Sequence, residues 1–180
     1  MDARPLAAGP VRLEPFAERH FTARYVAWLN DPESVRYSEQ RHRRHDAASC
    51  RAYVEAMRAG GHLLWAIVAN EPRDGHVGNL SAHVDAPNRT ADLAILLGEP
   101  AARGRGYGRA ALSAACAWLL TEAGMRKVTA GTMAANHPFR AIARACGMHE
   151  EGRRQRQFLL DGAEIDLVMF ARFAGPADGH

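Results

Sequence analysis

Apolar and polar positions change period several times along the chain, and each change predicts an element. Residues 11–14 alternate as a strand does, whereas the apolar positions from Phe21 to Leu29 recur at the spacing of one helix face. Residues 30–32 include a proline and are expected to end this helix. Asp46 is the expected N-cap of a second helix, which stops at a pair of glycines. The N-terminal part of the chain therefore predicts one strand followed by two helices.

The middle of the chain contains apolar runs that are short enough for strands. Runs at 63–68, 76–80 and 90–97 predict three consecutive strands, and residues 72–75 predict a turn between the first two. The apolar positions of residues 112–120 recur at helical spacing. This region therefore predicts three strands followed by a third helix.

The last part of the chain predicts a strand at 127–133, a short helix after Asn136 and then a hairpin. The hairpin is indicated by Asp161-Gly162, which separates two apolar runs. No internal repeat or linker interrupts the pattern, so we expect a single α/β domain over residues 11–173. Residues 1–10 are expected to be an N-terminal extension, and residues 174–180 a disordered tail.

A glycine-rich loop, Arg103 to Arg109, lies between the strand at 90–97 and the helix that follows. Glycine lets the backbone approach a ligand closely, and successive N–H groups can then converge on phosphate oxygens at the positive end of the helix. A nucleoside-triphosphate loop would need Lys-Ser/Thr where Arg109-Ala110 stands, and a dinucleotide loop would need an acidic residue near 128–131. The loop therefore indicates a pyrophosphate site of another kind, or else only a tight strand-to-helix turn.

A second motif downstream decides between these interpretations. The loop has the form Arg103-x-x-Gly106-x-Gly108, and it is followed by Asn136, Gly147-Met148 and Glu151-Gly152. Together these residues resemble the Gln/Arg-x-x-Gly-x-Gly/Ala loop and the Asn…Gly-Phe…Glu-Gly segment of the GNAT superfamily of acetyl-CoA-dependent N-acetyltransferases. The chain looks most like the subgroup of ribosomal-protein alanine and amino-sugar N-acetyltransferases. The likeness covers about residues 11 to 173.

The resemblance implies a fold and a co-substrate. It implies a single α/β domain of GNAT type, with a mixed, mostly antiparallel sheet, about four helices, and fourth and fifth strands that splay apart. The pantetheine arm of acetyl-CoA would enter the gap between those strands. The residues implied to hold acetyl-CoA are Ile95, Leu96, Leu97, Arg103, Gly104, Arg105, Gly106, Tyr107, Gly108, Arg109 and Asn136.

Composition agrees with an enzyme of this size and limits its partners. The chain has 180 residues, of which 47% are hydrophobic and 24% charged, as in one globular domain. No apolar run approaches the ~20 residues of a membrane span, and no signal-peptide core begins the chain. The three cysteines are expected to be buried thiols of a reducing compartment. We therefore expect a cytoplasmic monomer or homodimer without a membrane partner, and no metal, because the histidines lack ligand spacing.

Acetyl transfer to an amine sets further requirements. Amines of pKa about 8 to 10 are mostly protonated at neutral pH, so a base must remove a proton. The resemblance implies a carboxylate at the start of the fourth strand, where Asp92 stands, with Glu99 as the second candidate. Asp92 can instead be a solvent-facing strand residue without a catalytic role. Glu99 can instead be a residue that only precedes a loop.

The general acids of many relatives are missing from the sequence. The positions of the usual tyrosine and serine are Ala143 and Phe139. A thiol of pKa about 8.5 leaves tolerably near neutrality, so water can protonate it. Asn136 is the expected side-chain contact to pantetheine or acceptor, and it can also cap a helix.

Charge points to the kind of acceptor. The net charge is +3, and Arg41, Arg43 and Arg44 concentrate positive charge between the two N-terminal helices, where they can clamp a phosphate. A solvated charge run is the alternative. Residues 37–41, the entry into the strand at 90–97 and the Asp161-Gly162 hairpin also resemble those of amino-sugar acetyltransferases in surface-polysaccharide pathways. With this resemblance we expect a nucleotide-linked amino sugar as acceptor, with a protein N-terminus as the second hypothesis and a non-catalytic acyl-CoA sensor as the third. Nucleic acid is not expected, because the few aromatic residues fall mostly on apolar faces.

Overall fold

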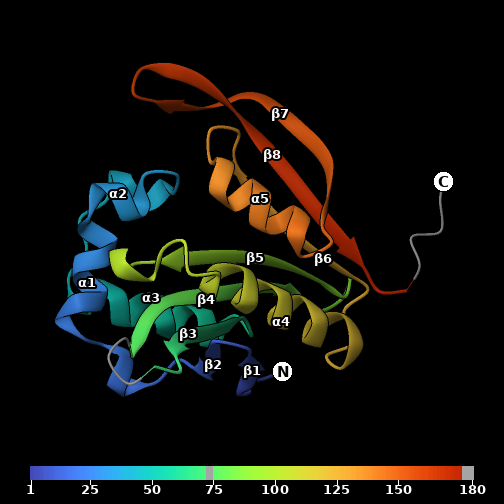
Figure 1. Cartoon of the computed structure of the whole chain (residues 1–180), viewed down its shortest axis with the longest axis horizontal. Coiled ribbons are helices and arrows are strands. Elements are labelled where there is room, and N and C mark those ends of the chain that lie inside the picture. The colour runs from blue at the N-terminus through green and yellow to red at the C-terminus, as the bar shows by residue number, and fades with distance from the viewer. Residues whose placement is uncertain (72–74, 176–180) are drawn as a thin grey trace.

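The computed structural model, shown in Figure 1, describes residues 1–71 and 75–175. Its strands are β1 (Leu6–Ala8), β2 (Val11–Pro15), β3 (Leu63–Ala69), β4 (His76–Asp85), β5 (Thr90–Leu97), β6 (Lys127–Met133), β7 (His149–Leu160) and β8 (Ala163–Phe173). Its helices are α1 (Ala23–Asn30), α2 (Pro32–Val35), α3 (Ala47–Ala59), α4 (Tyr107–Thr121) and α5 (His137–Ala145), with 3-10 turns η1 (Glu18–His20), η2 (Glu39–His42) and η3 (Pro100–Ala102).

The described strands form one sheet in the order β1-β2-β3-β4-β5-β6-β8-β7. Neighbouring strands are antiparallel except β5 and β6, which are parallel. These two strands pair only over Thr90–Asp92 and Lys127–Thr129 and then diverge. The predicted α/β fold with a mixed, mostly antiparallel sheet and two splayed strands is therefore confirmed. The splayed strands are the fifth and sixth here, because β1 precedes the predicted first strand.

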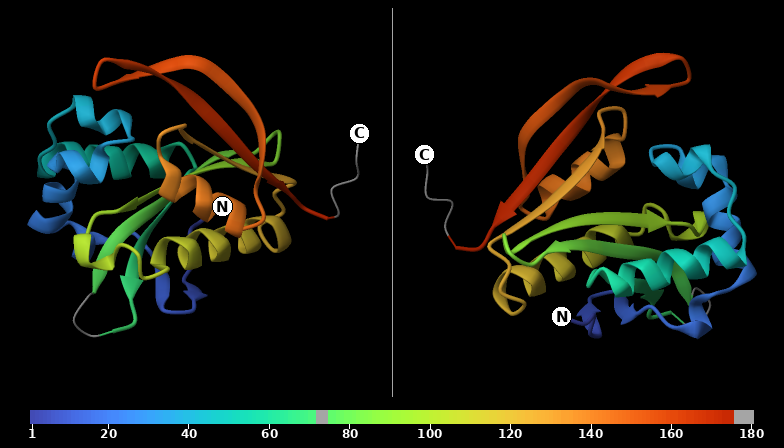
Figure 2. Two further views of the ribbon diagram at one scale, coloured as in Figure 1. Left: turned by 45° about the horizontal axis from the view of Figure 1, so that its top comes forward. Right: turned by 180° about the vertical axis from the view of Figure 1, so that it is seen from behind.

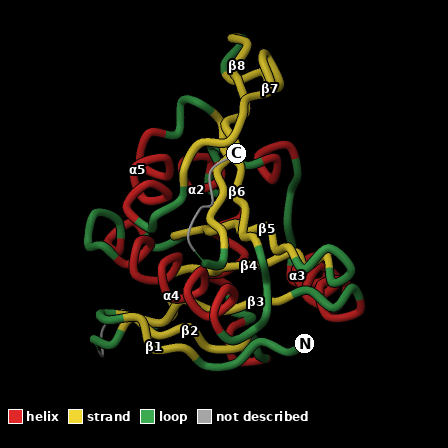
Figure 3. The backbone as a smooth tube through the Cα atoms, turned by 90° about the vertical axis from the view of Figure 1, so that its right-hand side faces the viewer, coloured by secondary structure: helices red, strands yellow, loops and turns green. Residues whose placement is uncertain are grey.

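Helices cover both faces of the sheet. Every side chain of β3 is buried, and successive side chains belong to opposite cores, since they alternate across a strand. Trp65 packs into the core that contains α4, whereas Ala66 packs into the core that contains α1 and α3. Figure 3 shows α4 and α3 on opposite sides of the strands, and the rear view in Figure 2 shows α3 lying across the second face.

The N-terminal region contains two elements that the sequence pattern did not predict. Residues 6–8, expected to belong to an extension, form β1, where Leu6 pairs with Leu13 and is buried. The predicted stop of α1 is correct, but it also starts α2, because the Asp31 side chain accepts a hydrogen bond from the Ser34 N–H and Pro32 begins the new helix. The prediction of about four helices becomes five α-helices among the described residues.

The late hairpin is confirmed and is longer than its apolar runs suggested. Asp161 and Gly162 have φ of 52° and 80°, as both central residues of a type I′ turn require. The expected turn at 72–75 falls largely on residues 72–74, and the expected tail largely on residues 176–180, both outside the described residues. Cys50, Cys116 and Cys146 are free and buried, as expected. None of the described helices is long and apolar enough to cross a membrane.

Candidate functional site

The site begins with the backbone of β5, beyond the point where β6 leaves it. The Gly98 N–H donates to the Val77 carbonyl at 3.1 Å, and the bonds of an antiparallel ladder fall on every second residue. The peptide groups of Ile95 and Leu97 therefore point away from β4, toward the side of β6. Because β6 pairs with β5 no further than Asp92, these groups have no partner in the described sheet. An extended ligand can bind them as an added strand does.

The glycine-rich loop, where the glycine spacing predicts an anion cradle, lies at the N-terminus of α4. Gly104 and Gly106 have φ of 74° and 78°, and Gly106 is the N-cap. In the described structure no side chain caps the helix, so its first N–H groups are available to an anion at the positive end of the dipole. A Cβ on Gly108 would lie 3.2 Å from Leu97 Cδ1, which shows how closely the helix start packs on β5.

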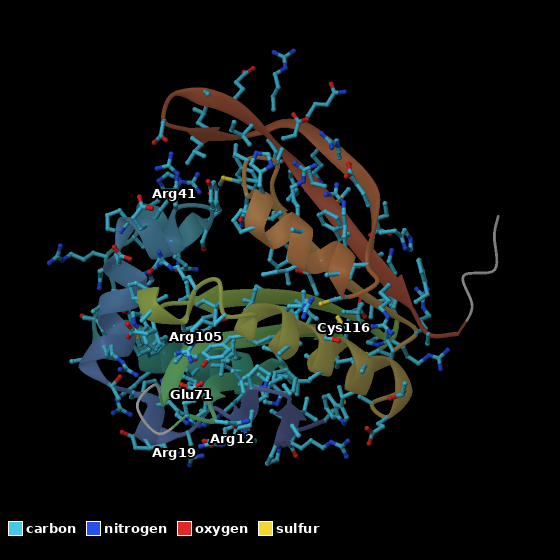
Figure 4. All side chains as sticks on the ribbon, in the orientation of Figure 1. Arg12, Arg19, Arg41, Glu71, Arg105 and Cys116 are labelled. Carbon is cyan, nitrogen blue, oxygen red and sulfur yellow. The ribbon has the colours of Figure 1, made fainter. Side chains whose placement is uncertain are left out.

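Arginines extend this cradle outward. Arg105, Gly106 and Arg109 line a small hollow of about 310 Å³ together with Pro10 and other residues. Arg105 forms an ion pair of 2.8 Å with Glu71, and Figure 4 shows the two side chains near the start of α4. Two guanidinium groups beside free helix N–H groups suit a ligand that carries several phosphates.

A larger cavity of about 1190 Å³ adjoins the loop at Arg103 and Gly104. Residues of α1, of the segment 33–45, of α3, β4, β5, β6 and α5, and of the β7–β8 hairpin line it. Its volume exceeds that of typical small-molecule sites, which span about 300–1,000 Å³. The cavity is therefore large enough for the reacting ends of two ligands.

The structure brings most of the predicted binding residues to this region. The predicted residues that line the large cavity are Ile95, Leu96, Leu97, Arg103, Gly104, Asn136, Arg43 and Arg44. Tyr107 and Gly108 are buried behind them. Arg41 does not line the cavity: its guanidinium pairs with Glu39 at 2.8 Å and donates to the Leu159 carbonyl at 3.2 Å. Arg41 therefore joins η2 to the late hairpin.

The two predicted catalytic carboxylates lie outside the cavity lining. Asp92 is exposed at the last paired position of β5, and its Oδ1 accepts a hydrogen bond of 2.6 Å from Thr129 Oγ1. Glu99 lies 3.7 Å from Arg24 Nη1. A proton can reach either carboxylate from the cavity only through water.

Asn136 lines the cavity, but both ends of its amide are engaged. Its Oδ1 accepts a hydrogen bond from the Phe139 N–H at 3.2 Å, which makes it the N-cap of α5, and its Nδ2 donates to Thr132 Oγ1 at 3.0 Å. Phe139 and the buried Ala143 belong to the apolar packing of α5. Phe139 also lines the cavity, but neither it nor Ala143 can supply a proton.

Sequence reasoning missed a row of polar side chains on β4. Asn79 and Ser81 are both 7% exposed and line the cavity. Burial raises the pKa of the nearby Tyr53, against the effect of a hydrogen bond with Ser81. Glu39 also lines the cavity. The sequence could have indicated Asn79 and Ser81 as site residues, because polar side chains inside an otherwise apolar strand are unusual unless they bind a partner or a ligand.

Metal chemistry has no candidate ligands here. Within residues 1–71 and 75–175, no three His, Cys, Asp or Glu side chains come together as a metal site requires. The described site offers backbone groups, arginines, neutral polar side chains and the carboxylates of Glu33 and Glu39. These groups can bind a phosphate-bearing acyl carrier and an acceptor side by side.

Comparison with known proteins identifies this arrangement. Residues 11–149 match the acetyltransferase (GNAT) domain family. No curated protein matches the sequence. Among solved structures, the ribosomal alpha-N-protein acetyltransferase RimL, in complex with coenzyme A, has a TM-score of 0.80 at 17% identity, covering 94% of this chain and 98% of that chain.

Two further structures have the same fold with other ligands. Spermidine N-acetyltransferase from Vibrio cholerae, in complex with CoA and spermine, has a TM-score of 0.79 at 14% identity, covering 92% of this chain and 96% of that chain. The microcin self-immunity acetyltransferase MccE, in complex with acetyl-CoA and AMP, has a TM-score of 0.76 at 17% identity, covering 92% and 93%. At such identities these likenesses show the fold and not the acceptor.

Proposed function

Since the chain belongs to the GNAT acetyltransferase family, we propose that this N-acetyltransferase acetylates a primary amine on an anionic acceptor, best represented by a nucleotide-linked amino sugar of surface-polysaccharide biosynthesis. The acyl donor is acetyl-CoA. Its pyrophosphate would lie on the glycine-rich start of α4, and its pantetheine would follow the free peptide groups of Ile95 and Leu97. We also propose that the reaction takes place in the cytoplasm, in keeping with three free, buried thiols.

The acceptor proposal rests on which arginines around the cavity have an ion-pair partner and which do not. Arg36 and Arg41 form ion pairs with Glu33 and Glu39. Arg43 and Arg44 line the cavity and have no ion-pair partner among the described residues. Two uncompensated guanidinium groups at the acceptor side favour a phosphate-bearing ligand and disfavour a polyamine.

Asp92 remains our proposed base, acting through water. It stands where β5 and β6 part, and solvent reaches it. Asp92→Asn preserves the hydrogen bond from Thr129 and removes the charge, so kcat should fall roughly 100-fold while acetyl-CoA still binds. Glu39→Gln is the comparison, because Glu39 lines the cavity. If Glu39→Gln loses the activity and Asp92→Asn keeps it, the base lies on the cavity wall instead.

The remaining steps require no dedicated acid. The peptide N–H groups at the β5–β6 opening can stabilise the oxyanion of the tetrahedral intermediate, since preorganised backbone donors do so in many acyl transfers. The amine attacks the thioester carbon, the C–S bond breaks, and water protonates the thiolate. Asn136 contributes by holding the start of α5 at the cavity wall.

A protein N-terminus is the second candidate acceptor, favoured by the fold shared with RimL. The bound AMP named for MccE favours the first, because it shows that the same fold accommodates a nucleotide. A thiol-release screen with acetyl-CoA against nucleoside-diphosphate amino sugars, simple polyamines and short peptides separates these acceptors. Turnover of peptides or polyamines with none of the nucleotide sugars would refute the proposed acceptor. No thiol release with any amine would instead favour the acyl-CoA sensor.

A further inference from the structure

A half-buried histidine, His76, and a buried asparagine, Asn79, meet at the cavity wall. His76 Nε2 lies 2.9 Å from Oδ1 of Asn79, three residues further along β4. Asn79 is 7% exposed and lines the cavity. Its backbone is opposite Leu96 of β5, at the level of the free peptide groups of the opening.

The His76 ring is held in place by aromatic neighbours. Its centroid lies 5.0 Å from the Trp28 ring, 5.1 Å from the His20 ring and 6.0 Å from the Phe16 ring. The Arg24 guanidinium also bonds to the His76 carbonyl. Because the ring packs against α1, η1 and Phe16, which follows β2, it cannot turn without disturbing the core on that side of the sheet.

The surroundings also determine which nitrogen carries the proton. His76 Nδ1 is buried and has no hydrogen-bond partner among the described residues. An N–H there would remain unsatisfied, at a cost of about 1–3 kcal/mol. We therefore assign the proton to Nε2, with Nε2–H donating to Asn79 Oδ1. Burial lowers the pKa of His76 to about 4, so the ring is neutral near neutral pH.

This hydrogen bond fixes the orientation of the Asn79 amide. With Oδ1 occupied by His76, the Nδ2 group faces the cavity, and no described residue accepts its hydrogens. The neighbouring Ser81 bonds with Tyr53, and Leu96 is apolar. Asn79 Nδ2 is reachable from the cavity, so a ligand or water there can accept a hydrogen bond from it.

We propose that Asn79 binds the acceptor substrate by donating from Nδ2 to an oxygen atom close to the reacting amine, and that His76 is the positioning residue that prevents the amide from flipping. Asn79 shares its face of the sheet with α1 and α3, which form the acceptor wall of the cavity. The recognised group is a hydroxyl, ether or carbonyl oxygen, so the pair selects oxygen-bearing amines over plain alkyl amines. This inference rests on the proposed N-acetyl transfer and specifies its acceptor further.

A double-mutant cycle tests the pair. Asn79→Leu removes the donor, and His76→Phe keeps the aromatic packing but cannot hold the amide. Each single variant should raise the acceptor KM about tenfold, the loss of one good hydrogen bond, with the acetyl-CoA Kd unchanged. The double variant should be no worse than Asn79→Leu alone, because His76 then has nothing to orient. A full additional loss from His76→Phe in the Asn79→Leu background would overturn the proposal.

A third variant keeps the test decisive if His76→Phe does not fold. Asn79→Asp accepts the His76 hydrogen bond as well as asparagine does but offers no donor to the acceptor. It should raise the acceptor KM at least as much as Asn79→Leu, and an unchanged KM in both variants would refute the role of Asn79. The first probe is a nucleoside-diphosphate-linked amino sugar. If that probe fails and a polyamine or peptide is turned over, the proposed acceptor is wrong, and the cycle is then run on the amine that reacts.

Discussion

Arg36, which follows α2, and Asp161, in the turn of the β7–β8 hairpin, form an ion pair of 2.5 Å although 125 positions separate them. Figure 1 shows the hairpin arching from the side of α5 over to α2. The bond from Arg41 to the Leu159 carbonyl lies beside this pair. Residues of both segments line the large cavity. These contacts therefore join the hairpin to the segment 36–41 over the cavity, and we call this junction the roof.

We expect the Arg36–Asp161 ion pair to affect acceptor binding more than the stability of the fold. The two side chains are 41% and 68% exposed, so their pair should contribute less than about 1 kcal/mol to the free energy of unfolding. Asp161→Asn keeps a residue that tolerates the positive φ of this turn and removes the charge. The acceptor KM should rise severalfold, with little change in thermal stability, as steady-state kinetics and calorimetry can measure.

Glu164→Gln is the matched control for the roof. Glu164 lies on the same hairpin, and its ion-pair partner among the described residues is Arg156, at 3.3 Å on that hairpin. The control should leave the acceptor KM unchanged. Equal effects of Asp161→Asn and Glu164→Gln would mean that overall hairpin charge, and not the roof contact, sets the acceptor affinity.

The glycine at the start of α4 provides a second prediction. Gly106→Val places a branched side chain at φ 78° and blocks the approach of a pyrophosphate to the helix N–H groups. Acetyl-CoA affinity should fall on the order of 100-fold, which corresponds to about 2.7 kcal/mol. Isothermal calorimetry on the folded variant measures the loss.

Gly124→Val separates this loss from backbone strain. Gly124 has φ 75° and, like Gly106, open space where a Cβ would be, but it follows the other end of α4. Both variants should lose similar stability from the left-handed conformation, of about 1–2 kcal/mol. Only Gly106→Val should lose acetyl-CoA affinity, and a loss shared by both would point to general destabilisation.

The uncompensated arginines give a third prediction. Replacing Arg43 and Arg44 by Gln should raise the acceptor KM well over tenfold, because each charge-assisted contact contributes about 1.5–3 kcal/mol. The acetyl-CoA KM should stay the same. Added salt should weaken acceptor binding in the wild-type enzyme, since exposed charges are screened within about 10 Å at 0.1 M.

A double substitution on the outer hairpin controls for net charge. The double variant Arg154→Gln with Arg156→Gln also removes two positive charges, but from residues that do not line the cavity. This control should leave the acceptor KM nearly unchanged. An equal effect of both doubles would indicate a long-range field, and no effect of the Arg43 and Arg44 double would remove the physical support for a phosphate-bearing acceptor.

Local patterns were sufficient to predict the framework and the backbone of the glycine-rich loop. The continuous apolar run of β3 and the glycine spacing at Gly104–Gly106 are local, so their geometry follows from neighbours in sequence. The turn at Asp161-Gly162 was equally local. What the sequence could not supply was pairing over long distances. It gave no sign that Leu6 would pair with Leu13 in a new edge strand.

Long-range pairing also decided which charged residues reach the cavity. Arg41, Arg43 and Arg44 are indistinguishable in sequence, yet Arg41 is committed to the hairpin through the Leu159 carbonyl. The resemblance pointed to Asp92 on β5, and in the structure that side chain is exposed and accepts a hydrogen bond from Thr129 Oγ1. Asn79 was overlooked because it stands within an apolar run, and only its meeting with His76 shows its orientation.

His76 provides the last prediction, which concerns stability and pH. Burial lowers its pKa to about 4, and the neighbouring His20 pKa is lowered in the same direction by burial. An unfolded histidine has a pKa of about 6.5, so the unfolded chain binds the proton more readily than the native chain. The stability that neutral His76 supports is complete above that value and is lost as pH falls toward 4. Between pH 7 and 5 the free energy of unfolding should drop by about 2 kcal/mol from His76 alone.

Urea unfolding of the wild type and of His76→Phe at pH 7 and pH 5 isolates this contribution. His76→Phe has no proton to bind at this position, so its unfolding free energy should fall with pH about 2 kcal/mol less than that of the wild type. Groups that face His76, chiefly His20, Arg24 and Asn79, remain in both proteins. His42→Gln removes an exposed histidine instead and should leave the pH dependence unchanged. Parallel pH curves for wild type and His76→Phe would mean that His76 titrates normally in the native protein, and the case for a permanently neutral ring beneath Asn79 would fail with it.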